Sequence, residues 1–103
     1  MSSVPVAQLS ALAPGRCQLL GVLGFATAPA LWRQAATLLG AQVEGSVEVD
    51  LSGVTHSDSA GLALLVAWQS QARARGVALR YTAVPERLVA IAKISSVDSL
   101  LVG

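Results

Sequence analysis

A run of polar side chains, Thr55-His56-Ser57-Asp58-Ser59, contains the residue types of a Ser-His-Asp hydrolytic site. Such a triad is assembled in space from separate elements, and in the commonest α/β version its serine lies in a G-x-S-x-G elbow. Here the serine lies in Asp-Ser-Ala-Gly, and three neighbours in one loop cannot easily point at one another in series. We therefore expect no catalytic residues, and we interpret His56 as a solvated loop residue.

Two carboxylates, Asp50 and Asp58, lie toward the end of one predicted strand and suggest a paired acid/base site. A carboxylate just ahead of a helix also caps exposed N–H groups and complements the helix dipole, a contribution of about 1 kcal/mol. This second explanation needs no catalysis, so both residues are expected to support the start of the helix. A small enzyme or ligand carrier that uses Asp50 and Asp58 remains the weakest of three possible functions.

The sequence indicates no metal or cofactor. One histidine and the distant Cys17 do not supply the three or four ligands of a zinc site. Neither G-x-x-x-x-G-K-[ST] nor G-x-G-x-x-G is present, so no cradle for nucleotide phosphates is recognisable. Cys17 is the only cysteine and lies in an apolar segment, which predicts a buried and inert thiol.

Composition limits the classes of partner. Of the 103 residues, 53% are hydrophobic and 13% charged, whereas a typical soluble domain has roughly 25% charged residues. The net charge is +1 and the basic residues are scattered, so neither nucleic acid nor an anionic membrane is an expected partner. The longest uncharged stretch, 17–32, is too short and too interrupted to span a membrane, and the N-terminus lacks a secretory signal. We expect one cytoplasmic domain, 1–103, with some apolar surface left outside its core.

Periodicity and turn residues give the order of the elements that hold the polar run. The expected elements are strands at 4–12 and 16–24, a helix capped by Thr27, a strand at 46–52, a helix at about 59–76, a strand at 77–84 and a helix from Pro85 to about Ser95. The first helix should close at 40–45, and the tail 97–103 is ambiguous. This order predicts an α/β fold, a mixed β-sheet with helices packed mainly on one face.

The helix predicted from Ser59 is apolar on two sides. At 3.6 residues per turn, one side is suited to packing on the sheet: Gly61, Leu64, Leu65, Trp68 and Ala72. A second stripe follows at i, i+3, i+4 and i+7: Ser59, Leu62, Ala63 and Val66. We expect this second stripe to lie outside the core and to bind a partner protein.

The segment VDLSGVTHSDSAGLALL, residues 49–65, resembles the signature of STAS domains. It has a strand ending in Asp-Leu-Ser, a short turn, and Asp-Ser-x-Gly-Leu at the start of a helix. The family includes anti-sigma factor antagonists and the cytoplasmic tails of sulfate transporters. Within it the chain is most similar to the MlaB type, the small STAS subunit of bacterial ABC complexes that move phospholipids between the outer and inner membranes. Gly61–Leu65, Leu31-Trp32 and Ile91–Lys93 carry this similarity.

The resemblance implies a non-enzymatic subunit, without cofactor, that binds the ATPase of a phospholipid-transporting ABC complex and stabilises or regulates it. The complex would include permease and substrate-binding subunits, would hold this chain at the inner membrane, and would maintain outer-membrane lipid asymmetry. The resemblance also places Ser59 at the hydroxyl that antagonists use as a phosphorylation site and that MlaB-type subunits usually fill with threonine. Serine at this position, followed by Ala60 in place of glycine, keeps a second function open: an anti-sigma factor antagonist regulated by a serine kinase acting on Ser59.

Overall fold

The computed structural model describes residues 6–38 and 45–94, which form strands and helices in the predicted order. The elements are β1 (Ala7–Ala13), β2 (Arg16–Leu23), α1 (Ala28–Leu38), β3 (Ser46–Ser57), α2 (Ser59–Ala74), β4 (Ala78–Thr82) and α3 (Glu86–Ile94). The predicted closure of the first helix at 40–45, apart from Gly45, and the tail 97–103 lie outside the described residues.

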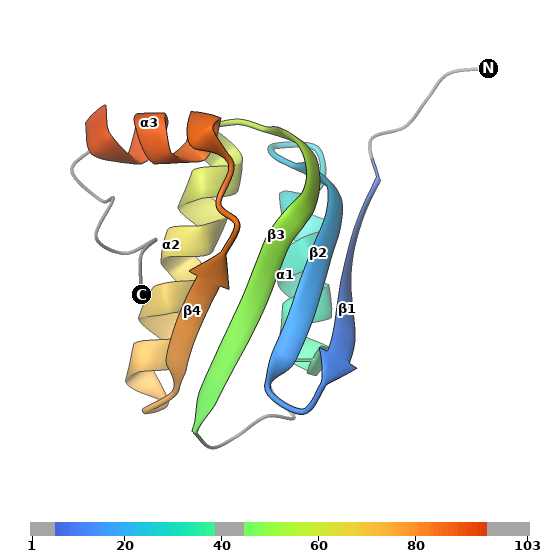
Figure 1. Cartoon of the computed structure of the whole chain (residues 1–103), viewed down its shortest axis with the longest axis vertical. Helices are drawn as coiled ribbons and strands as arrows, with labels where there is room; N and C mark the ends of the chain where they lie inside the picture. Colours follow the sequence, from blue (N-terminus) through green and yellow to red (C-terminus); the bar gives the residue numbers. More distant parts are fainter. Residues whose placement is uncertain (1–5, 39–44, 95–103) are drawn as a thin grey trace.

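The strands form one mixed sheet in the order β1-β2-β3-β4. β1 and β2 are an antiparallel hairpin that turns at Pro14-Gly15, where Gly15 takes a φ of 78°. β2, β3 and β4 are parallel, and parallel neighbours need a crossover, which α1 and α2 provide. Figure 1 shows both helices on the same side of the sheet, with α3 across one end. The predicted α/β class is confirmed.

The core lies between the sheet and its helices because strand residues alternate between the two faces. On β3 the buried residues are Val47, Val49 and Leu51, as the alternation predicts. They pack with buried side chains of the neighbouring elements, which include Cys17, Leu19, Leu23, Leu31, Leu65, Trp68, Leu79 and Leu88. Cys17 is 1% exposed, and burial raises the pKa of its thiol, in agreement with the predicted packing role.

Two glutamines tie helices to the outer strands of this sheet. Gln34 of α1 accepts a hydrogen bond from the Leu9 N–H in β1 through Oε1, at 2.8 Å. Gln69 of α2 donates from Nε2 to the Leu79 carbonyl oxygen in β4, at 2.7 Å, and is itself buried. The two helices are therefore fixed to the sheet by polar contacts as well as by the apolar core.

The third strand is longer than the sequence pattern predicted. It continues through Ser57, so the polar run at 55–57 belongs to a strand and not to a short turn. His56 pairs with Val22 of β2 and is exposed, which corrects its assignment to a loop. The parallel neighbour supplies the backbone hydrogen bonds, and polar side chains are tolerated because a strand with one open face can expose them to water.

Candidate functional site

The start of α2 is organised by the carboxylate of Asp58, which is the N-cap of the helix. Its Oδ1 accepts a hydrogen bond from the Gly61 N–H at 3.0 Å, and its Oδ2 accepts one from the Phe25 N–H at 3.2 Å. The Gly61 bond is the main cause of a lowered Asp58 pKa, with smaller contributions from Phe25 and from the charge of Arg87 on α3. Asp58 therefore joins the loop before α1 to the first turn of α2.

Two glycines allow this close assembly. A Cβ atom at Gly61 would overlap the Leu23 carbonyl group at the end of β2, with only 2.8 Å to its carbon. A Cβ atom at Gly24 would lie 2.7 Å from Oδ2 of Asp58. The first turn of α2 thus packs on backbone, and larger residues at either glycine would push the elements apart.

The loop between β2 and α1 is held from inside by Thr27. Its buried hydroxyl donates to the Val22 carbonyl oxygen at 2.6 Å and accepts from the Gly24 N–H at 3.1 Å. Thr27 does precede α1, and its carbonyl oxygen accepts from Leu31 N–H. Its side chain turns back into the loop, however, so the predicted side-chain cap of α1 is not formed.

Ser59 is the first residue of α2 and is exposed, and the capping position before it is taken by Asp58. Ala63, one turn farther along, is also exposed. Val66 is half-buried and packs against the core. These three residues of the predicted second stripe remain at least partly accessible on one side of α2.

Leu62 does not belong with them. It is 5% exposed and lies in the core, so the prediction that it faces outward is wrong. The reason is that α2 contacts β3, β4, α1 and α3, which cover more than one side of the helix. The other predicted stripe is correct: Gly61, Leu64, Leu65 and Trp68 are buried, and Ala72 packs against the core half-buried.

Phe25 is a surface residue that the sequence did not single out. Its side chain is 82% exposed, although its backbone N–H is bonded to Asp58 at the start of α2. The sequence did contain a clue to this exposure: Phe25 lies inside the short Gly24–Thr27 turn, where a large side chain has few core residues to pack against. We define the α2-start patch as Phe25, Ser59, Ala63 and Val66.

Asp50 lies away from this patch. Its Oδ1 accepts from the Ser52 N–H at 2.8 Å within β3, and this bond lowers the Asp50 pKa. Eight residues of extended chain separate it from Asp58, roughly 25 Å along a strand. The expected support of the helix by Asp50 is therefore wrong, and the two aspartates do not form a paired carboxylate site.

The hydrolytic arrangement does not receive support from the geometry. Each carboxylate oxygen of Asp58 accepts a backbone N–H group, and His56 extends from a strand. Across 6–38 and 45–94, no three His, Cys, Asp or Glu side chains gather as a metal site would require. Within the same ranges, no helix has the length and apolarity needed to cross a membrane.

Comparison with known proteins gives a family and a fold. No curated protein matches the sequence. Among solved structures, the murine Solute Carrier 26 family member A9 anion transporter in the inward-facing state matches 80% of this chain, with 17% identity and a TM-score of 0.65. The crystal structure of Mglu matches 78%, with 23% identity and a TM-score of 0.57. The matches span only 14% and 20% of those proteins, and at these identities they show the fold alone.

The family is given by a sequence model described as Mlab, STAS domain, which matches residues 7–103. The matched range contains every strand and helix described above, and it contains the Asp58-Ser59-Ala60-Gly61 start of α2. The chain therefore belongs to the Mlab STAS domain family.

Proposed function

We propose that the protein is a regulatory subunit, without catalytic activity of its own, of an ABC complex that transports phospholipids and maintains outer-membrane lipid asymmetry. It binds the ATPase subunit on the cytoplasmic side of the inner membrane and stabilises or regulates it. Membership of the Mlab STAS family supports this proposal. The observation that carries it is the α2-start patch, where an exposed aromatic ring and an exposed hydroxyl stand on a rigid base.

The patch has the features of a protein-binding surface. Phe25 is 82% exposed, yet its loop is fixed by the hydrogen bonds of Thr27 and Asp58. The loop backbone that carries the ring therefore has little freedom left to lose on binding, and aromatic anchors often dominate interface energies. Ala63 and Val66 extend the apolar surface along α2, and Ser59 provides a hydrogen-bonding group at its edge.

An anti-sigma factor antagonist is the second candidate, and the exposure of Ser59 favours it. A phosphate on Ser59 would lie at a helix N-terminus, where backbone N–H groups favour anions, and Arg87 is close enough to act on the charge of neighbouring Asp58. Mass spectrometry of the protein purified from its native cells separates the two candidates. Phosphate on Ser59, together with a co-purified serine kinase, would support the antagonist and contradict the transporter subunit.

The transporter proposal is tested by placing one negative charge in the patch. Ala63→Glu should leave the free domain folded, because the position is exposed, and should weaken ATPase binding at least about 100-fold through an unpaired, desolvated carboxylate. Circular-dichroism melting and a binding titration with the ATPase subunit measure the two effects.

Ala74→Glu is the matched control. Ala74 is exposed on the same face of α2, about three turns or about 16 Å farther along, so its charge should not affect binding. Phe25→Ala should weaken binding by about 2 kcal/mol or more, with a stability change within about 0.5 kcal/mol. Wild-type affinity in both Ala63→Glu and Phe25→Ala would show that the ATPase does not bind this patch.

A further inference from the structure

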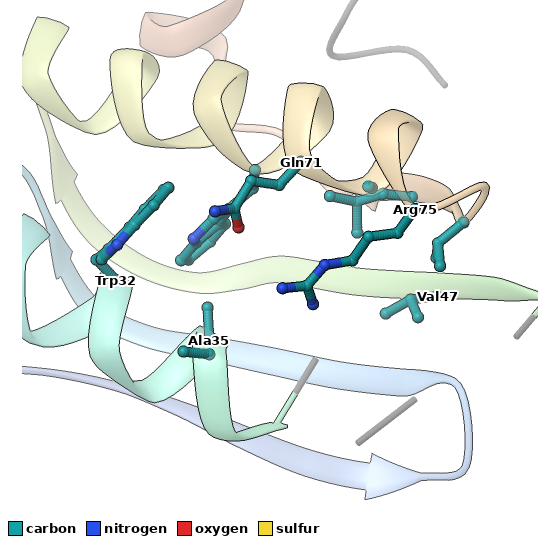
Figure 2. Close-up of a pocket in the computed structure, with 10 residues that line it drawn as sticks. Trp32, Ala35, Val47, Gln71 and Arg75 are labelled. Carbon is teal, nitrogen blue, oxygen red and sulfur yellow. The ribbon is translucent and has the colours of Figure 1, made fainter. Parts of the chain in front are cut away.

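A cavity of about 90 Å³ lies between α1 and α2, beside the C-terminal half of α2. Trp32 and Ala35 of α1, Val47 of β3, and Trp68 and Gln71 of α2 line it, together with Arg75 just after the helix. Figure 2 shows Trp32 at one end and Val47 at the other, with the side chains of Gln71 and Arg75 reaching from α2 over the space that Ala35 faces. We call this space the α1–α2 cavity.

The polar side chains of the cavity offer more hydrogen-bond donors than acceptors. Trp68 is 2% exposed, and its Nε1 is buried without a hydrogen-bond partner. Gln71 carries an amide, which can donate and accept, and Arg75 carries a guanidinium, which only donates. None of the described lining residues is acidic. A buried N–H without an acceptor is unfavourable. The cavity therefore presents apolar walls and a positive charge at its opening, and one of its lining side chains has a buried N–H without an acceptor.

We propose that the α1–α2 cavity binds a small aliphatic monocarboxylate. The hydrocarbon lies against Trp32, Ala35 and Val47, and the carboxylate accepts hydrogen bonds from Arg75 and from the Trp68 indole. A carboxylate suits these groups because its two oxygens accept several donors at once, and bonds between ionised partners are the stronger ones. An apolar molecule would leave the Trp68 donor unpaired, and an inorganic anion would leave the apolar walls uncovered. The proposal does not depend on the ATPase.

The volume sets the size of the ligand. A dry cavity of about 150 Å³ takes benzene, and 90 Å³ is smaller. It encloses roughly four carbon atoms. Because Trp32 is 39% exposed at the rim, longer chains can extend past it into water. Affinity should thus rise from acetate to pentanoate and change little from hexanoate onward.

The experiment is a titration of the purified protein with hexanoate, with 1-hexanol as the neutral analogue. The chain contains two tryptophans and both line the cavity, so fluorescence and the two indole N–H signals in ¹H–¹⁵N spectra report on it directly. We expect saturable binding of hexanoate, at least about tenfold tighter than hexanol, with a downfield shift of the Trp68 N–H signal. Equal affinity for the two compounds, or no saturation by hexanoate at about 10 mM, overturns the proposal.

Three variants locate the site. Arg75→Gln should remove the preference for hexanoate over hexanol, whereas Arg73→Gln, exposed on α2 and outside the cavity, should keep it. Ala36→Leu, which adds bulk to the lining, should weaken both ligands at least about tenfold, whereas Ala74→Leu should weaken neither. Trp68→Phe should weaken hexanoate more than hexanol. Unchanged preference in Arg75→Gln and unchanged affinity in Ala36→Leu would place the ligand elsewhere and contradict the proposal.

Discussion

At its first turn α2 packs against the backbone of β2 through Gly61, and Asp58 bonds it to the neighbouring loop. In its last turns the same helix borders a cavity, and the indole N–H of Trp68 has no partner. The first end is closely packed, and the capping hydrogen bonds of Asp58 are formed there. Its outer surface remains exposed to solvent and is the proposed protein-binding surface. The other end leaves internal space suited to a small molecule. The two proposals thus assign two different kinds of recognition surface to one helix.

The largest expected effect concerns the cavity end. Trp68→Ala should destabilise the domain by about 3 to 5 kcal/mol, because a 2% exposed indole leaves the core and the existing cavity grows. Trp32→Ala, which removes an indole that is 39% exposed, is the control and should cost clearly less. Urea unfolding of both variants gives the comparison. Equal losses would mean that the two rings contribute alike and that the cavity is not closed by Trp68.

The packed end is tested by Gly61→Ala. Alanine has the higher helix propensity by about 1 kcal/mol, so propensity alone predicts stabilisation. The overlap of a Cβ with the Leu23 carbonyl group should reverse the sign and destabilise by about 1 to 3 kcal/mol. Thermal melting measures it, with Ser70→Ala on the exposed side of α2 as the control, in which helix propensity acts alone and should stabilise slightly. A Gly61→Ala protein that melts at a higher temperature than wild type would contradict the close packing of Gly61 on the Leu23 backbone.

The smallest expected effect is that of the cap, and it depends on pH. Asp58→Asn should cost about 1 kcal/mol at pH 7, because the amide loses the negative charge at the helix N-terminus and one of the two oxygens that accept from Gly61 and Phe25. The pKa of Asp58 is lowered in the folded state, chiefly by the Gly61 bond. A carboxyl with a lowered folded pKa stabilises fully above its unfolded value, near 3.8, and loses this contribution as the pH falls through the folded pKa. Melting curves from pH 7 to pH 2 should therefore show wild type and variant converging at the acidic end. A constant difference across this range would contradict the role of the charge.

The packed end was largely predictable because its features are local in sequence. A carboxylate ahead of a helix, glycine in the first turn and a 3.6-residue period identified the role of Asp58 and the buried side of α2. The order of the seven described elements followed from similar patterns. The end of β3 was misplaced because a polar run was taken as a turn, although the neighbouring β2 extends the ladder to Ser57.

The remaining errors have tertiary causes. Leu62 is buried because several elements surround α2, which the periodicity of one helix cannot show. The exposure of Phe25 depends on how Thr27 folds its loop, and the cavity depends on how α1, α2 and β3 meet. The prediction that Asp50 supports the start of the helix failed because β3 continues to Ser57, beyond the segment in which apolar and polar residues alternate.

The two glutamines that hold the outer strands have a consequence for self-association. An outer strand with unpaired N–H and C=O groups is a template on which another chain can add a strand and begin to aggregate. Gln34 occupies the Leu9 N–H of β1, and Gln69 occupies the Leu79 carbonyl oxygen of β4. Both borders of the described sheet thus carry a side chain on a backbone group that an incoming strand would need. One backbone group on each border is therefore occupied from within the domain, which makes strand addition at that position less favourable.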